Sequence, residues 1–163
     1  MLVLDVGCGD NPKGNINVDI CIGWSPQTGN QKDKLAFINP RMIKNFVLAS
    51  GEFLPFQSDC FERVVSFEVI EHANNPMQFL HELIRVSKSE IVVSTPHRYS
   101  ISAKMPFHKH FFTRSWFVQA CKKENVKIKS VKITYTYPFD FGIVKLPLAR
   151  IHRMFFTIKK YSS

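Results

Sequence analysis

The stretch LDVGCGDNPKGNINVDI, residues 4–20, predicts two strands joined by a tight turn. An apolar run ends at Val6, glycines stand on both sides of Cys8, and a second apolar run ends at Asp19. Glycine lets a backbone approach a ligand closely, because no Cβ stands in the way. In an open parallel sheet such a turn lies at the edge where ligands bind. The stretch therefore predicts an α/β fold with a binding site at this turn.

Short apolar runs rich in β-branched residues recur along the first hundred residues. Each is bounded by Gly, Pro, Asn or Ser, as expected for strands buried on both faces of a parallel sheet. The predicted strands cover residues 2–6, 16–20, 46–49, 63–67 and 90–94. Between residues 21 and 45, the breakers Pro26, Gly29 and Pro40 leave space for only a short helix.

Two helices are predicted in the second half of the chain. Asn75 can cap the first, and Pro76 suits its first helical position. Thr113 can cap the second, and Asn125 can end it. An alternating strand over residues 126–135 follows, and residues 154–158 can pair with it as a closing antiparallel strand.

These elements predict one domain over residues 1–163 with a Rossmann-like α/β fold. We expect a mostly parallel sheet with helices on both faces and an antiparallel C-terminal strand pair. Only six residues separate Gly9 from Ile16, so the first helix should be shortened or missing. The role of residues 138–152 stays open between a substrate lid, a dimer contact and an irregular connection.

Charge is divided unevenly along the chain. Residues 1–100 carry 9 Lys and Arg against 11 Asp and Glu, whereas residues 101–163 carry 13 against 2. The basic C-terminal third is either a solvated face or a surface that attracts an anionic substrate. The four cysteines form no CxxC pair, and the chain shows no secretion signal and no apolar run long enough to span a membrane. We therefore expect a cytoplasmic protein with reduced cysteines.

The turn after the first strand admits three interpretations. A nicotinamide fingerprint needs a third glycine where Pro12 stands and an acid about 20 residues on, whereas Asp19 comes only ten residues after Gly9. An adenosyl ligand fits better, because the Asp19 carboxylate can accept both ribose hydroxyl protons. Asp5 then either fixes the loop by accepting backbone N–H groups or faces a cationic ligand such as a sulfonium. The third interpretation is a tight turn without a ligand.

The chain resembles the class I S-adenosylmethionine-dependent methyltransferases over roughly residues 2–125, and in particular the methyltransferase type 11-like group. LDVGCG resembles the first motif of that family, and SGEFLPF (residues 50–56) resembles its adenine-bordering segment. FERVVSFEVIEH (61–72) and IVVSTPH (91–97) are similar to its fourth and fifth strands. The resemblance implies S-adenosyl-L-methionine as cofactor and the following cofactor-binding residues: Asp5, Gly7, Cys8, Gly9, Asp19, Ser50, Gly51, Glu52, Phe67 and Glu68. The family often has an acid where Ser50 stands.

A metal site is suggested by EVIEH, residues 68–72. Glu68, Glu71 and His72 lie at i, i+3 and i+4, so one helical turn places them on one side. The HKH motif can add an imidazole from His108 or His110, and we assign this ligand to His110. Together these side chains offer oxygen and nitrogen ligands for Mg or Mn. The set resembles the metal sites of small-RNA 2′-O-methyltransferases and of ubiquinone-pathway O-methyltransferases. The other interpretation is that the Glu71–His72 pair binds no metal and only starts a helix or faces the substrate.

His72 and His97 are the candidate catalytic residues. Methyl transfer depends mainly on an acceptor held in line, and an oxygen acceptor gains from a base or a metal. His97 directly follows Pro96 at the end of the fifth predicted strand, where a base or a substrate contact is expected. No NPPY-type block and no Pro-Cys pair after the fourth strand are present, which favours oxygen of a small molecule or of RNA as the acceptor.

Two other function classes stay open. The missing first helix, and the absence of N-terminal helices over the site, also suit a non-catalytic methyltransferase-fold subunit that binds a partner protein. Such an open site equally suits a large substrate, or a homodimer or partner subunit that serves as its lid. A nicotinamide-dependent oxidoreductase is the third class, and Pro12 and the early Asp19 disfavour it.

Overall fold

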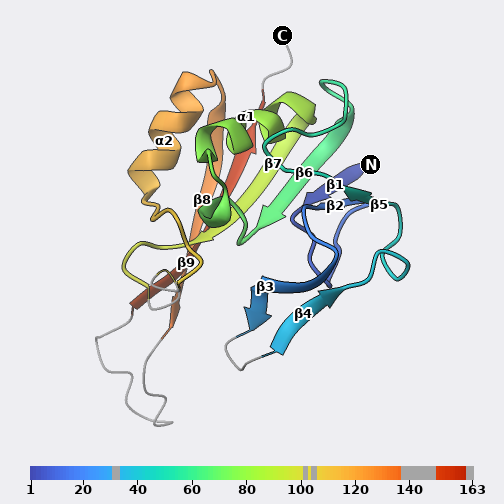
Figure 1. Cartoon of the computed structure of the whole chain (residues 1–163). Helices are drawn as coiled ribbons and strands as arrows, with labels where there is room; N and C mark the ends of the chain where they lie inside the picture. Colours follow the sequence, from blue (N-terminus) through green and yellow to red (C-terminus); the bar gives the residue numbers. More distant parts are fainter. Residues whose placement is uncertain (31–33, 101–102, 104–105, 137–149, 161–163) are drawn as a thin grey trace.

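A computed structural model describes residues 1–30, 34–100, 103, 106–136 and 150–160 (Figure 1). Seven strands form one sheet in the order β5-β2-β1-β6-β7-β9-β8. From β5 to β7 all neighbours run parallel, and β9 is antiparallel to both β7 and β8. The strands are β1 (Val3–Val6), β2 (Ile16–Asp19), β5 (Phe46–Leu48), β6 (Phe61–Phe67), β7 (Ser87–Pro96), β8 (Lys127–Thr136) and β9 (Arg150–Lys159). The predicted fold class is confirmed, including the antiparallel C-terminal pair.

The prediction of a short helix between residues 21 and 45 is wrong. Strand β3 (Gly23–Asn30) pairs antiparallel with β4 (Lys34–Ile38) and forms a separate hairpin. Proline and glycine exclude a helix in this segment, but a two-stranded ribbon tolerates them because both of its strands are edges. Ile38 at the end of β4 is buried against Cys8 and Ile43, which anchors the hairpin beside the glycine turn.

Both helices begin at the residues that the sequence predicted. The side chain of Asn75 accepts a hydrogen bond from the Gln78 N–H (3.1 Å) at the start of α1 (Pro76–Val86). Thr113 accepts from the Trp116 N–H (3.4 Å) at the start of α2 (Arg114–Lys123). Asn125, with φ of 55°, follows the end of α2.

The two helices pack on the same face of the sheet (Figure 1). Strand register places Leu4, Val64 and Ile91 in one row of that face. This row belongs to the core cluster that also contains Phe79 of α1 and Phe117 of α2. The described connections between β1 and β6 contain no α-helix, so the first helix is missing as predicted. The sequence predicted helices on both faces of the sheet, whereas the two described α-helices cover only one face.

The order of the strands locates the site. After β1 the chain builds the sheet on one side, through β2 and β5, and then returns to build the other side from β6 onward. Ligands of open α/β sheets bind at such a reversal, beyond the carboxyl ends of the strands. Here the loops after β1 and β6 meet, and the 3₁₀ helix η1 (Ile70–His72) follows β6 directly. Residues 137–149, which include most of the segment whose role was left open, lie outside the described residues.

All four cysteines lie in the described part of the chain, where none of them forms a disulfide. Neither described helix has the length and apolar character that a membrane crossing requires.

Candidate functional site

The glycine turn forms where β1 ends and touches the loop after β6. Gly7 has φ of 76° and Gly9 has φ of 55°, the left-handed region that favours glycine. The N–H groups of Gly7 and Cys8 both donate to the Val18 carbonyl, at 2.8 and 3.0 Å. A Cβ on Gly7 would lie 2.2 Å from a methyl group of Val69, so only glycine lets the two loops approach this closely.

Two buried carboxylates hold this turn. Asp19, at the end of β2, accepts hydrogen bonds from the Gly9 N–H (2.9 Å) and the Cys21 N–H (3.0 Å), one on each oxygen. Because a carboxylate has about four acceptor positions, Asp19 keeps one on each oxygen for a ligand's hydroxyl groups. Asp5 accepts from the Lys13 N–H (2.7 Å), and burial raises its pKa to about 6. Asp5 therefore fixes the loop, the first of the two roles considered for it.

Residues 50–52, which were predicted to border an adenine, contact the start of helix α1. Glu52 is buried, and its Oε1 accepts from the N–H groups of Asn74 (2.5 Å) and Asn75 (3.1 Å), at the start of α1. A Cβ on Gly51 would lie 2.3 Å from the Phe79 ring, so this glycine permits close packing of the loop on α1. Ser50 Oγ accepts from the Glu52 N–H (3.2 Å). Glu52 thus binds the backbone at the start of α1.

Glu68 leaves β6 in a left-handed conformation, with φ of 58°. Its Oε1 accepts from the Ser94 hydroxyl (2.7 Å), and its Oε2 pairs with Arg153 Nε (2.9 Å). Burial raises the pKa of the Glu68 carboxyl, and the Arg153 cation opposes that rise. Phe67, next to it, is 36% exposed at the end of the strand. One oxygen of Glu68 thus binds a residue of β7 and the other a residue of β9.

Three potential metal ligands gather immediately after β6. Glu71, His72 and His108 each offer a ligand atom, and these atoms lie within 4.8 Å of one another. His72 Nδ1 lies 3.0 Å from the Phe107 carbonyl, and His108 Nδ1 lies 3.2 Å from the Ala103 carbonyl. A carbonyl can only accept, so in both rings Nδ1 carries the proton and Nε2 keeps its lone pair. Burial lowers the pKa of both histidines, which favours this neutral form.

Glu71 is the buried acid of this cluster, with 1% of its surface exposed. Its Oε2 accepts from the Thr95 hydroxyl (3.2 Å), while its Oε1 is buried without a hydrogen-bond partner among the residues that the structure describes. Burial, together with the nearby Glu68 charge, raises its pKa to about 8. An orphaned carboxylate oxygen beside two neutral imidazoles is a donor set that fits a divalent cation.

The structure brings His108, and neither Glu68 nor His110, together with Glu71 and His72. His110 Nε2 instead lies 3.0 Å from the Ala73 carbonyl. Glu68 does not join because its left-handed backbone turns its carboxylate toward Arg153, so the assumed single helical turn does not begin at this residue.

The segment after β7 closes over η1. The N–H groups of Lys109 and His110 donate to the Glu71 carbonyl, at 2.9 and 3.2 Å. Lys109 Nζ donates to Asn74 Oδ1 (2.6 Å). These hydrogen bonds hold the segment against η1 and so place His108 beside Glu71 and His72. The HKH motif therefore contributes its first histidine to the cluster, in place of its second, whereas no pattern in the sequence marked Arg153 or Thr95.

His97 lies at the end of β7 and is 9% exposed. Its Nδ1 accepts from the Tyr99 N–H (3.4 Å), so the neutral ring carries its proton on Nε2. Burial lowers its pKa, which keeps the ring neutral near pH 7. In this tautomer Nε2 of His97 is a hydrogen-bond donor.

Residues 4–93, more than half of the chain, match a family model described as the methyltransferase domain. The chain belongs to this methyltransferase family. The class I S-adenosylmethionine-dependent resemblance drawn from the motifs is thereby confirmed, and S-adenosyl-L-methionine is the cofactor of the family's members. No curated protein matches the sequence of this methyltransferase.

Solved structures of low sequence identity share the fold of this methyltransferase. An S-adenosylmethionine-dependent methyltransferase from Thermotoga maritima is 15% identical, with a TM-score of 0.69 over 98% of this chain and 82% of the other. A Haloferax volcanii methyltransferase in complex with the Trm112 activator is 14% identical, with a TM-score of 0.62 over 96% and 80%. Magnesium protoporphyrin IX methyltransferase from Synechocystis, with bound S-adenosylmethionine, is 10% identical, with a TM-score of 0.60 over 99% and 70%.

Proposed function

We propose that this chain binds S-adenosylmethionine beside the glycine turn, beyond the carboxyl ends of β1 and β6, and transfers its methyl group to a hydroxyl oxygen. The observation that carries this proposal is the position of the Glu71, His72 and His108 cluster, directly after the loop whose Val69 would meet a Cβ on Gly7. The proposed site for activating an oxygen thus adjoins the glycine turn.

Asp19 is the proposed ribose-binding residue. Its carboxylate is buried at the end of β2 and keeps acceptor capacity beyond its two backbone hydrogen bonds. In this proposal the methionine part of the cofactor is bordered by the backbone around Gly7, Cys8 and Gly9. Asp5 holds this loop in place by accepting a hydrogen bond from the Lys13 N–H. The proposed adenine-side contacts come from Ser50 and Gly51, held in place by Glu52, and the remaining edge is formed by Phe67 and Glu68.

Glu71, His72 and His108 are the proposed ligands of a divalent cation, Mg or Mn. The Glu71 Oε1 without a hydrogen-bond partner and the two Nε2 lone pairs supply one oxygen and two nitrogen donors. When bound, such a cation lowers the pKa of a hydroxyl group that it coordinates. The backbone carbonyls on Nδ1 fix the tautomer and orientation of each ring, as is usual for histidine ligands. The raised pKa of Glu71 means that the carboxyl must release a proton when a cation binds.

The proposed acceptor is a hydroxyl of a small molecule or of RNA, and the basic C-terminal third favours an anionic one. His97 would donate a hydrogen bond from Nε2 to the acceptor and position it, with His72 serving as a metal ligand. Four cysteines without a disulfide favour the cytoplasm as the compartment.

A second candidate function is a methyltransferase-fold subunit that acts through a partner protein. Both described α-helices pack on one face of the sheet, which leaves the other face without a helical layer in the described residues. The Haloferax volcanii neighbour was solved with its activator, so a fold of this kind can bind a partner.

Calorimetric titration with S-adenosylhomocysteine and with NAD tests the first step. We expect the adenosyl compound to bind, NAD not to bind, and Asp19→Ala to weaken adenosyl binding at least tenfold. Transfer of a labelled methyl group to RNA and to small hydroxyl compounds is then measured with Mn²⁺ and after chelation. Binding without transfer to any acceptor would favour the subunit function, and a folded protein that does not bind the adenosyl compound would exclude the enzyme.

A further inference from the structure

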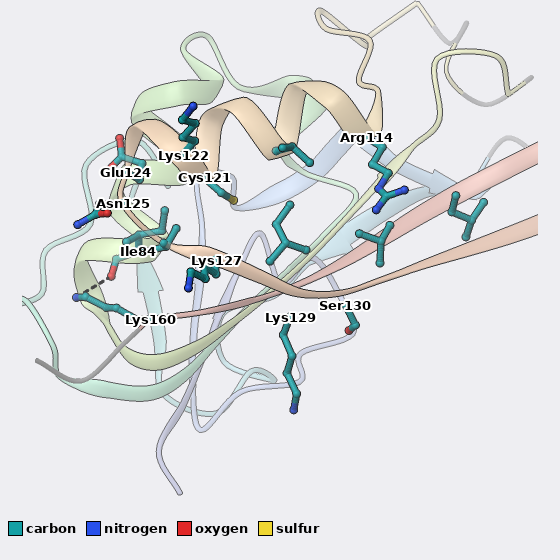
Figure 2. A pocket seen from close by; sticks show the side chains of 15 residues that line it. Ile84, Arg114, Cys121, Lys122, Glu124, Asn125, Lys127, Lys129, Ser130 and Lys160 are labelled. Carbon is teal, nitrogen blue, oxygen red and sulfur yellow. Dashed lines mark hydrogen bonds between the residues drawn. The ribbon is translucent and has the colours of Figure 1, made fainter.

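A shallow groove runs along one edge of the sheet, between α2 and the edge strand β8 (Figure 2). Its volume is about 1100 Å³. We call it the α2–β8 groove, and Glu71, His72 and His108 are not among the residues that line it. The residues that matter here are Arg114, Val118, Lys122, Ile128, Lys129 and Val131.

Along this groove, the backbone of β8 forms the outer edge of the described sheet. In the described sheet β8 is the last strand and pairs only with β9. The outward N–H and C=O groups of an edge strand can pair with an added strand. Residues 127–133 line the groove apart from Lys132, and at strand spacing they span about 20 Å. The groove therefore has room for an extended peptide of about six residues.

The floor of the groove is apolar. Val118 on α2 is 47% exposed, and Ile128, Val131 and Ile133 of β8 are half-buried beneath it. A strand added to β8 would place alternate side chains on this floor. Among the described residues that line the groove none is aromatic, although aromatic side chains are what proteins stack single-stranded bases on. The floor favours a peptide over a nucleic acid.

The rim of the groove is basic. Five of its six charged side chains are cations. The acid, Glu124, is bound to His81 Nδ1 (2.8 Å), and one cation, Lys160, is paired with Asp59 (2.5 Å). Figure 2 shows Lys129 on the outer side of β8, pointing away from α2. A second copy of this chain would bring the same lysines, and like charges across a strand pair are destabilising.

We propose that the α2–β8 groove binds an extended acidic segment of a partner protein, which adds a strand to β8. Its apolar side chains lie on the Val118, Ile128 and Val131 floor. Its Asp or Glu side chains alternate with them and lie on the opposite face of the added strand, where Lys129 points (Figure 2). This inference goes beyond the proposed methyl transfer and does not depend on it, since the groove does not use the cofactor residues.

The test uses the purified chain without cofactor and a fluorescein-labelled eight-residue peptide that alternates Glu and Val. Fluorescence anisotropy should show binding that weakens with added salt. The double variant Lys122→Glu, Lys129→Glu should bind roughly tenfold more weakly. Arg41→Glu, Lys44→Glu makes the same charge change in the exposed loop before β5, at the opposite edge of the sheet, and should bind within about twofold of wild type. Amide hydrogen exchange along β8 should slow when the peptide binds.

Val118→Lys separates groove binding from general charge attraction. This change adds a cation but removes part of the apolar floor, so we expect weaker binding. A peptide of equal charge with proline in place of each valine lacks half of the N–H groups and should not bind. Tighter binding by Val118→Lys, equal binding of the proline peptide, or displacement by an oligouridylate at lower concentration would each overturn the proposal. Lys129→Ser replaces the double variant if circular dichroism shows that the double variant is unfolded.

Discussion

The imidazole rings of His72 and His108 meet edge to face with their centroids 4.7 Å apart, although 36 residues separate them in the chain. Each ring directs Nδ1 to a backbone carbonyl, of Phe107 and of Ala103 respectively. Two neutral rings are thus held in one tautomer beside the buried Glu71. This is the arrangement on which the proposed cation site rests.

Replacing His108 should remove cation binding, and replacing His110 should not. His108→Gln loses a nitrogen ligand, so calorimetric affinity for Mn²⁺ should fall at least tenfold. His110→Gln is the matched control, because an amide N–H can still donate to the Ala73 carbonyl as His110 Nε2 does at 3.0 Å. Equal loss in both variants, or in neither, would contradict the assignment of His108.

Gly51 should be intolerant of alanine because of Phe79. The added Cβ would lie 2.3 Å from the ring, so Gly51→Ala should lower the free energy of unfolding by about 2 kcal/mol. Phe79→Leu in the same chain should restore part of that loss, measured by urea unfolding. Gly23→Ala is the control, since Gly23 has φ of 87° and open space around its Cβ position. The stability lost in Gly23→Ala comes from its backbone conformation, so Phe79→Leu should not restore any of it.

Glu52 should be required as an acceptor and not as a charge. Glu52→Ala removes the charged acceptor of two partly buried backbone N–H groups, at Asn74 and Asn75, and should cost about 2 kcal/mol of stability. Glu52→Gln keeps a carbonyl oxygen and should cost less than half as much. Both are measured by thermal unfolding. A glutamine variant as unstable as the alanine variant would show that the negative charge at the start of α1 carries the effect.

Asp5 should make stability fall as the pH rises. Burial raises its pKa from 3.8 to about 6, so between these values the unfolded chain releases the proton first. Stability from this group is complete below pH 3.8 and is lost as the pH passes through about 6. Asp5→Asn keeps an acceptor for the Lys13 N–H and removes the titration. Its stability relative to wild type should therefore increase by about 2 kcal/mol between pH 4 and pH 7, measured by urea unfolding. A pH-independent difference would contradict this.

The fold was largely predictable because its signals are local. Strands buried on both faces appear as short apolar runs, and the caps Asn75 and Thr113 stand at the helix starts as predicted. The hairpin of residues 23–38 was missed because its proline and glycine look like breakers when only a helix is considered. The ribose-binding prediction for Asp19 also followed from position alone, since it ends a strand beside the glycine turn.

The sequence by itself determined the parallel sheet, the glycine turn, the lack of a first helix and the presence of histidines after the fifth predicted strand. Spacing along one segment fixes these features, because backbone periodicity and turn chemistry act over a few residues. Only the tertiary structure decided which histidine joins Glu71, where Glu68 points and what Glu52 holds. Those outcomes depend on the left-handed backbone at Glu68 and on the segment after β7 folding back over η1, and contacts between distant segments leave no period in the sequence.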